Sequence, residues 1–368
     1  MRQFFRGLLA AAFAGGLFAG AAMPALAQDD KDKGEDTAVP TVDGLRLLGT
    51  WYAGNKGRNS DTVIMLHGYG SNATKGEWQS LAKALAAEGF SVLTFDFRGH
   101  NRSGTAKAIS SPKDFCNLNK FTFNKLSGET LDPNRLTSLN YKKFSGNYFP
   151  YLVNDIAAAR RFCDQRNDNG ECNTGRLYII AEKEMCSLAL LWMGTEFFRQ
   201  AIYPQQGGVG NPARHEGSRD LVGAVWLSFR RQQTVDAAVN RLVNQPNIAR
   251  GEINAEQTLR EKIGMAFVYS DEDKTSAQVS RGWLNQFRVR PDAKEDKELG
   301  KYLIEVKGAK SSTGIELLSP KLGVEKQIIE FMKATRKKNV AGVDNQPRNT
   351  NSKEPEIVDL TTYFGYPK

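Results

Sequence analysis

The sequence predicts an α/β fold built on a doubly wound, mostly parallel sheet. Two observations predict it: short continuous apolar runs recur along the chain, and amphipathic stretches with helical periodicity separate several of them. Strands that are apolar throughout are typical of parallel sheets with helices on both faces. In such a sheet, functional side chains gather at the carboxyl ends of the strands. The predicted strands cover residues 62–66, 91–95, 176–181, 221–227, 265–269 and 302–306.

The segment between the first two strands shows the helical pattern most clearly. A helix is expected over residues 77–88, where Trp78, Leu81, Ala82 and Leu85 recur at spacings of three and four. Residues at these spacings share one face of a helix, so this face is expected to pack on the sheet.

The first 27 residues have the pattern of a secretory signal peptide. Arg2 and Arg6 precede an apolar run over residues 7–23. Residues 25–27 then read Ala-Leu-Ala, which places small side chains at the cleavage positions. The run is short for a membrane span, and no basic cluster follows it. We therefore expect export to the periplasm or the medium, with no transmembrane anchor left after cleavage.

Composition predicts four further segments. Residues 28–41 are expected to be an acidic linker, residues 42–335 the α/β domain, and residues 336–368 a flexible polar tail. Inside the domain, residues 105–147 form a long insertion after the second predicted strand. Its aromatic side chains favour packing over disorder. They are Phe115, Phe121, Phe123, Tyr141 and Phe144.

The charge of the chain does not indicate a nucleic-acid partner. Fifty Lys and Arg residues against 41 Asp and Glu residues give a net charge of +9, and removal of Arg2 and Arg6 would lower it to +7. The basic residues are spread along the chain and mixed with carboxylates, whereas a nucleic-acid binder concentrates them on one face. We interpret the charge as favouring solubility.

Cofactors and metals are not expected. The sequence has no P-loop, no G-x-G-x-x-G after a strand and no paired histidines. The four cysteines lack metal-ligand spacing. In an oxidising compartment, Cys163 and Cys172 are the preferred disulfide pair because they flank one polar loop, whereas Cys116 and Cys186 are expected to be free.

Two loops at strand ends carry recognisable motifs. Residues 67–70 (HGYG) follow the strand at 62–66, and residues 95–104 (FDFRGHNRSG) follow the next strand. Together they resemble the HG oxyanion loop and the DxRGHGxS turn of the α/β-hydrolase family. The resemblance extends with decreasing specificity from about Gly44 to Lys333. It implies the α/β-hydrolase fold and a nucleophile in a G-x-S-x-G turn after the following strand.

The resemblance breaks at the nucleophile. Residues 177–191 have the strand and helix pattern of this turn, without a gap. In that register Ala181 and Met185 stand at the glycine positions, and Lys183 stands at the nucleophile. Lysine does not replace serine in acyl transfer. Met185 also argues against the sharp backbone turn, because small residues normally flank it.

The other two triad positions give one match and one absence. Residues 269–273 (YSDED) resemble the family's GxxD turn and place Asp273 at the acid. The histidine is expected after the last strand, but residues 306–314 contain none. Of the three histidines, His67 and His100 lie in the early loops and His215 lies in a polar loop. Because an acid alone does not activate a nucleophile, the resemblance implies a degenerate member of the family.

Three interpretations of Lys183 stay open: a surface lysine paired with Glu182 or Glu184, an anion-binding group near a helix N-terminus, and a desolvated amine nucleophile. Cys186 and Ser187 are expected to pack in the core. Asp273 is either the family's acid or a residue that caps a helix or pairs with Lys274 or a neighbouring basic group. A ligand, for which an anionic small molecule is one possibility, is expected to contact His67, Gly68, Tyr69, Lys183, Glu184 and Arg230.

Three functions are compatible with these residues. The first is an exported pseudohydrolase that binds a ligand or a protein partner at the former active-site cleft. The second is an esterase with a non-standard catalytic set. The third is a structural or interaction protein of the cell envelope.

Overall fold

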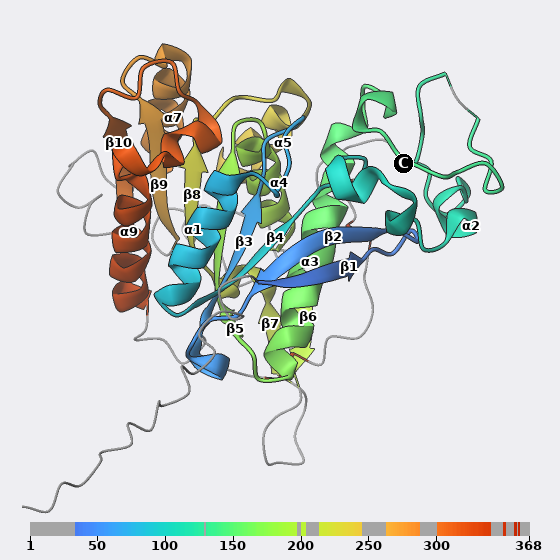
Figure 1. The fold of residues 1–368 in the computed structure, drawn as a ribbon, viewed down its shortest axis with the longest axis horizontal. Helices are drawn as coiled ribbons and strands as arrows, with labels where there is room; N and C mark the ends of the chain where they lie inside the picture. Colours follow the sequence, from blue (N-terminus) through green and yellow to red (C-terminus); the bar gives the residue numbers. More distant parts are fainter. Residues whose placement is uncertain are drawn as a thin grey trace, which may run out of the picture. The chain divides into compact units, whose positions relative to one another are not determined.

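Eight strands form one sheet in the order β1-β2-β4-β3-β5-β8-β9-β10 in the computed structural model (Figure 1). The structure describes residues 34–128, 130–196, 200–203, 213–244, 263–287, 300–339, 349–350, 357–358 and 360. The strands of this sheet are β1 Glu35–Pro40, β2 Arg46–Tyr52, β3 Asp61–Leu66, β4 Phe90–Phe95, β5 Asn173–Glu182, β8 Leu221–Leu227, β9 Gly264–Ser270 and β10 Lys301–Val306. A separate antiparallel hairpin contains β6 Gln200–Tyr203 and β7 Ala213–Glu216.

The sheet is parallel from β4 to β10, and only its first two strands run antiparallel to their neighbours. All six predicted strands are present, and β3, β4, β5, β8 and β9 are buried along their whole length. Continuous apolar sequence therefore corresponds to strands covered on both faces. The predicted doubly wound, mostly parallel α/β fold is confirmed.

Helices cover both faces of the sheet (Figure 1). One core contains apolar side chains of α1 and α9, and the other contains those of α3, α4, α5 and α7. The predicted helix at 77–88 is α1, and Trp78, Leu81, Ala82 and Leu85 are its buried residues. The helices are α1 Gly76–Ala87, α2 Pro112–Phe115, α3 Val153–Asp168, α4 Met185–Glu196, α5 Gln233–Asn244, α7 Lys274–Phe287 and α9 Val324–Asn339. Within the described residues, none of the helices is both long and apolar enough to cross a bilayer.

Two expected boundaries need correction. The linker expected at 28–41 contains β1, which pairs along its whole length with β2. The tail expected from residue 336 begins inside α9, which continues to Asn339. Farther along, the described tail residues pack on α3: the Thr350 hydroxyl donates to Asp168 over 2.9 Å, and the Val358 amide donates to Asn154. β1 was not predicted because its sequence is charged. An edge strand is stabilised by backbone pairing more than by apolar side chains. The signal peptide expected at 1–27 lies outside the described residues.

The aromatic insertion is packed on the domain, as predicted. Phe115 and Phe121 are fully buried, and Phe144 stacks on Tyr148 with ring centroids 4.1 Å apart. Phe123 stacks on Tyr151 at 5.1 Å. Aromatic pairs of this kind add to the free energy gained by burial alone.

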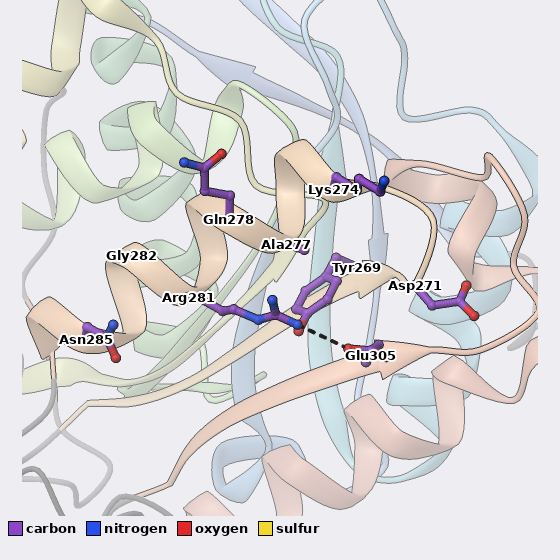
Figure 2. A pocket seen from close by; sticks show the side chains of 9 residues that line it. All are labelled: Tyr269, Asp271, Lys274, Ala277, Gln278, Arg281, Gly282, Asn285 and Glu305. Atoms are coloured by element: carbon purple, nitrogen blue, oxygen red, sulfur yellow. Dashed lines mark hydrogen bonds and ion pairs between the residues drawn. The ribbon is translucent and has the colours of Figure 1, made fainter.

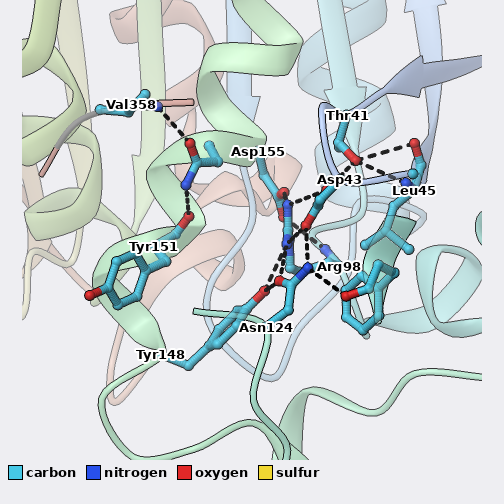
Figure 3. A network of polar contacts seen from close by, with 12 residues as sticks. Thr41, Asp43, Leu45, Arg98, Asn124, Tyr148, Tyr151, Asp155 and Val358 are labelled. Carbon is cyan, nitrogen blue, oxygen red and sulfur yellow. Dashed lines mark hydrogen bonds and ion pairs between the residues drawn. The ribbon is translucent and has the colours of Figure 1, made fainter. Parts of the chain in front are cut away.

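A buried arginine fastens this insertion to the sheet (Figure 3). The Arg98 guanidinium lies 2.6 Å from a carboxylate oxygen of Asp43 and 2.6 Å from one of Asp155, with all three side chains fully buried. It also donates to the Tyr148 hydroxyl over 2.7 Å. Asn124, in the insertion, donates to Asp43 over 3.0 Å. The cluster thus joins the loop before β2, the loop after β4, the insertion and α3.

Candidate functional site

The turn after β5 has the strained backbone of a nucleophile elbow. Lys183 follows the last residue of the strand and has φ +53°, a conformation that L-residues adopt at a cost of about 1–2 kcal/mol. Its N–H donates to the Leu227 carbonyl over 2.9 Å, and its carbonyl accepts from the Arg230 N–H over 3.3 Å. Backbone bonds to the end of β8 therefore hold the turn.

The expectation that Met185 would prevent this turn is wrong. Met185 is the first residue of α4, and its side chain is fully buried in the core. The side chain is accommodated by the core, so the position needs no glycine. Met185 is therefore compatible with a left-handed residue at position 183.

Glu182, directly before the turn, was expected only as a possible partner of Lys183, and its contact with Gly68 was not predicted. It is 1% exposed, and one carboxylate oxygen accepts the Gly68 N–H over 2.9 Å. The other oxygen lies 3.6 Å from the Lys183 ammonium nitrogen. A carboxylate on the protein thus binds a backbone donor of the predicted oxyanion loop. A charged residue ending an otherwise apolar strand was the available signal.

Two glycines make room for the Glu182 carboxylate. A Cβ atom on Gly68 would lie 3.1 Å from its carboxyl carbon, and one on Gly314 would lie 2.3 Å from its Oε1 atom. Gly314, in the loop after β10, also has φ +60°. Its N–H donates over 2.8 Å to the hydroxyl of Ser228. Glu182 is therefore enclosed by the loops that follow β3, β8 and β10.

His67 orders its loop and has no exposed surface for a ligand. Its Nε2 accepts from the Phe97 N–H over 3.1 Å, and its Nδ1 lies 2.9 Å from the Gly68 carbonyl. Burial lowers the pKa of His67, which favours the neutral ring. The predicted ligand contact by His67 is therefore corrected to a structural role.

His100 is held in the same way. Its Nε2 accepts from the Gly70 N–H over 3.2 Å, and its ring stacks on Tyr141 at 4.1 Å. Its Nδ1 lies 3.0 Å from the Arg98 carbonyl. Burial, aided by the neighbouring His67, lowers its pKa to about 4. The Nε2 atom of each early histidine thus joins the two loops, and each Nδ1 atom contacts a carbonyl of its own loop.

Asp273 caps a helix. It directly precedes α7, and its carboxylate accepts the Ser276 N–H over 3.0 Å and the Ser276 hydroxyl over 2.7 Å. Side-chain oxygens at this position satisfy free N–H groups of the first helical turn. Of the two interpretations of Asp273, the structure gives direct hydrogen bonds for the capping role.

The remaining members of the predicted ligand set lie around the elbow. Gly68 contacts Glu182, and Arg230 contacts Lys183 through the backbone. Tyr69 follows Gly68 and is 40% exposed, with its hydroxyl donating to the Tyr141 carbonyl over 3.3 Å. Lys183, Glu184 and Arg230 are each half-buried. The structure therefore gives contacts with the turn for Gly68 and Arg230, and the ligand contacts of the set stay a prediction.

The neighbouring thiol and hydroxyl groups are inert. Cys186 is fully buried, its thiol donates to the Ala181 carbonyl over 3.2 Å, and burial raises its pKa. Ser187 is buried, and its hydroxyl contacts Asp236 over 3.3 Å. Both therefore have the core position that was predicted.

The predicted disulfide is not formed. Cys163 and Cys172 are buried free thiols, and the Cys172 sulfur donates to the Cys163 carbonyl over 3.5 Å. The loop between them is held by other contacts, such as the Glu171 carboxylate with Arg166 at 2.7 Å. Among the described residues, no group of three or more metal-ligating side chains is gathered.

Comparisons with known proteins agree with this architecture. The model of the alpha/beta hydrolase fold family matches residues 61–157, which extend from β3 into α3. A search of curated proteins found no match. An esterase from Pyrococcus furiosus is similar in structure, with 14% identity over 83% of this chain and 91% of its own, and a TM-score of 0.46.

Two further solved structures have the same degree of similarity. A dienelactone hydrolase from Anabaena variabilis has 11% identity over 83% of this chain and 95% of its own, with a TM-score of 0.45. Est1E from Butyrivibrio proteoclasticus, with ferulic acid bound, has 10% identity over 83% of this chain and all of its own, with a TM-score of 0.47. The sheet order and the family match over residues 61–157 support the α/β-hydrolase fold for the described part of the chain.

Proposed function

We propose that this protein is a pseudohydrolase that binds a ligand with an anionic group at the elbow and performs no serine-hydrolase chemistry. The observation that carries the proposal is that other groups occupy both the expected nucleophile position and a backbone donor of the predicted oxyanion loop. Lys183 stands in the left-handed conformation of the nucleophile, while the Glu182 carboxylate accepts the Gly68 N–H beside it.

Each component needed for acyl transfer has another occupation or is replaced. The nucleophile position carries an amine that lies 3.6 Å from Glu182. Both early histidines are engaged in loop contacts, and Asp273 caps α7. An oxyanion donor must be free to receive developing negative charge, but Gly68 already donates to a carboxylate. These facts support the loss of hydrolysis.

An anionic group would find favourable partners at the same place. The Lys183 side chain is 27% exposed, and the Arg230 backbone is bonded to that of Lys183. Both residues lie near the N-terminus of α4, whose free N–H groups favour negative charge. The Glu182 carboxylate is buried, so a ligand would approach Lys183 and Arg230 from the solvent side.

An exposed aromatic ring adds a second contact. Tyr69 contacts His100, Tyr141 and Phe149 edge-on, with centroid separations of 5.1–5.5 Å, and remains 40% exposed. These neighbours hold the ring in place. An apolar part of the ligand would pack on it while the anionic group contacts Lys183.

The test combines a covalent probe with a turnover assay. Purified protein is incubated with a fluorophosphonate, its intact mass is measured, and hydrolysis of p-nitrophenyl acetate is compared with that of a heat-denatured control. We expect no adduct and no turnover above the control. A stoichiometric adduct would contradict the proposal, and peptide mapping would then locate the nucleophile of an esterase with a non-standard catalytic set.

Binding is tested separately with benzoate as the anionic aromatic probe. Chemical shifts or calorimetry would compare wild type, Lys183→Ala and Lys326→Ala, the last on the exposed surface of α9. We expect Lys183→Ala to weaken binding at least tenfold and Lys326→Ala to leave it unchanged. Equal binding by all three would contradict the anionic site and favour an interaction protein.

We also propose that the protein is exported through the segment 1–27. The charged start, the apolar run and the Ala-Leu-Ala end of that segment support this. The mass of the mature protein should correspond to cleavage after Ala27, and an intact N-terminus in the secreted or periplasmic fraction would contradict it.

A further inference from the structure

A groove of about 410 Å³ lies between α7 and the last two strands of the sheet, and none of its lining residues belongs to the turn after β5 (Figure 2). Its volume falls in the range that holds small ligands. Tyr269 of β9 and Glu305 of β10 are register partners on neighbouring parallel strands, so both side chains face α7. Neither residue has a role in the proposed function.

The helix wall of the groove is cationic and amide-bearing. Lys274, Gln278, Arg281 and Asn285 recur at spacings of four, three and four, which places them on one face of α7. All four are exposed. Within the described part of the chain, the Lys274 ammonium makes no hydrogen bond or ion pair. This wall therefore has a cation available for a ligand.

The strand wall carries the opposite charge. Asp271 follows β9, and its carboxylate accepts two long hydrogen bonds, from the Gly308 N–H over 3.3 Å and from the Ser270 hydroxyl over 3.4 Å. Glu305 lies 3.5 Å from the Arg281 guanidinium, with both side chains about half exposed. Such an exposed pair contributes little to folding, so a ligand can compete for either partner at low cost.

Small residues of α7 open the space between the two walls. Ala277 and Gly282 line the groove, and a Cβ atom added at Gly282 would meet no atom within 4 Å. A glycine in a helix costs about 0.5–1 kcal/mol relative to alanine. The groove is thus open at Gly282, where the helix has no side chain.

From these walls we infer that the groove binds a zwitterionic ligand of amino-acid to short-peptide size. The ligand carboxylate faces Lys274 and Arg281, and its ammonium group faces Asp271 and Glu305. The amides of Gln278 and Asn285 are positioned for peptide groups. A ligand with a single charge would leave one wall uncompensated, so both charges are required.

The probe is the dipeptide Ala-Ala, with its N-acetylated and C-amidated forms as matched controls. Titrations followed by calorimetry or chemical shifts are expected to show saturable binding of Ala-Ala. Blocking either end should weaken binding at least tenfold, because each removes one of the two charges. Equal affinity for all three forms would overturn the inference.

Variants locate the binding. Gly282→Leu places a bulky side chain at the groove, where its Cβ atom meets no atom within 4 Å, and Glu305→Gln removes one charge while keeping the shape. Each is expected to weaken Ala-Ala binding at least tenfold, while Lys326→Ala on α9 leaves it unchanged. Circular dichroism confirms folding of each variant. Wild-type affinity in folded Gly282→Leu, or no binding of Ala-Ala by wild type, would overturn the inference.

Discussion

The Arg98 cluster and the Lys183 turn both lie in loops that follow the carboxyl ends of parallel strands. They differ in how far the cation is buried and in how many partners it has. Arg98 is fully buried, with two carboxylates at 2.6 Å and a tyrosine hydroxyl at 2.7 Å. Lys183 is partly exposed, with one carboxylate at 3.6 Å. A buried charge needs many close partners because it has lost its hydration, whereas an exposed charge keeps water. The first cluster therefore holds the fold, and the second is free to contact a ligand.

The pKa of Asp43 follows from this burial. Desolvation disfavours its charge, but Arg98 and the hydrogen bonds from Thr41 and Asn124 together hold its pKa below the ordinary value. Asp43 is thus kept in the form that pairs with Arg98.

The largest expected effect comes from breaking the buried cluster. Arg98→Met should lower the free energy of unfolding by about 3–5 kcal/mol, because Asp43 and Asp155 would remain buried without their cation. Urea denaturation measures the change. Arg135→Met is the matched control, since its exposed guanidinium lies 3.5 Å from Asp132 and its loss should cost less than about 1 kcal/mol. Equal effects would contradict the contrast between buried and exposed pairs.

The second effect is a pH dependence at His100. Burial, with His67 nearby, lowers its folded pKa from 6.5 to about 4, so the unfolded chain binds the proton at higher pH than the folded protein does. Stability is therefore present above about pH 6.5 and is lost as the pH falls toward 4, by up to about 3 kcal/mol. Denaturation midpoints of wild type and His100→Gln between pH 4 and 7 check this.

Glutamine keeps an acceptor for the Gly70 N–H but does not titrate. The loss of stability between pH 6.5 and 4 should therefore be smaller in His100→Gln than in wild type. The same slope in both proteins would show that His100 titrates normally in the fold.

A smaller effect separates the two interpretations of Asp273. Asp273→Ala should cost about 1 kcal/mol of stability, because the Ser276 N–H loses its acceptor. Asp273→Asn should lower the stability by only about a few tenths of a kcal/mol, since asparagine caps helices as well as aspartate does. Thermal unfolding of both variants decides the point. A cost for asparagine as large as for alanine would mean that the charge matters.

The smallest expected effect tests the elbow backbone. At position 183 glycine should be more stable than alanine by about 1 kcal/mol, because only glycine adopts φ +53° without strain. At Lys333, inside α9, the order should reverse by a similar amount. Comparing the two pairs of variants by urea denaturation isolates the turn. Alanine equal to or better than glycine at 183 would contradict the strained elbow.

The sequence predicted the strands more successfully than the edges of the fold. Continuous apolar runs marked β3, β5 and β8 because these strands are covered on both faces. β1 was missed because its burial is low and its order comes from pairing with β2. A local sequence pattern indicates whether side chains are buried, but it does not indicate which strand pairs with the segment.

The sequence predicted which residues lie at the turn after β5, but it did not predict the contacts that they make. The motif spacing predicted a turn at Lys183, and the residue has φ +53°. The role of Glu182 depends on Gly68, 114 positions earlier, and on Gly314 after β10. No local pattern carries that information.

By itself, the sequence determined the α/β class and the positions of the two loop motifs after successive strands, because periodicity and motif spacing are local properties. Only the tertiary structure decided that Glu182 occupies the oxyanion loop, that Asp273 caps α7 and that Cys163 and Cys172 stay free. It also brought α7 against Tyr269 and Glu305 to form the groove. These depend on the distances between groups far apart in the chain, which packing of the whole sheet and its helices fixes.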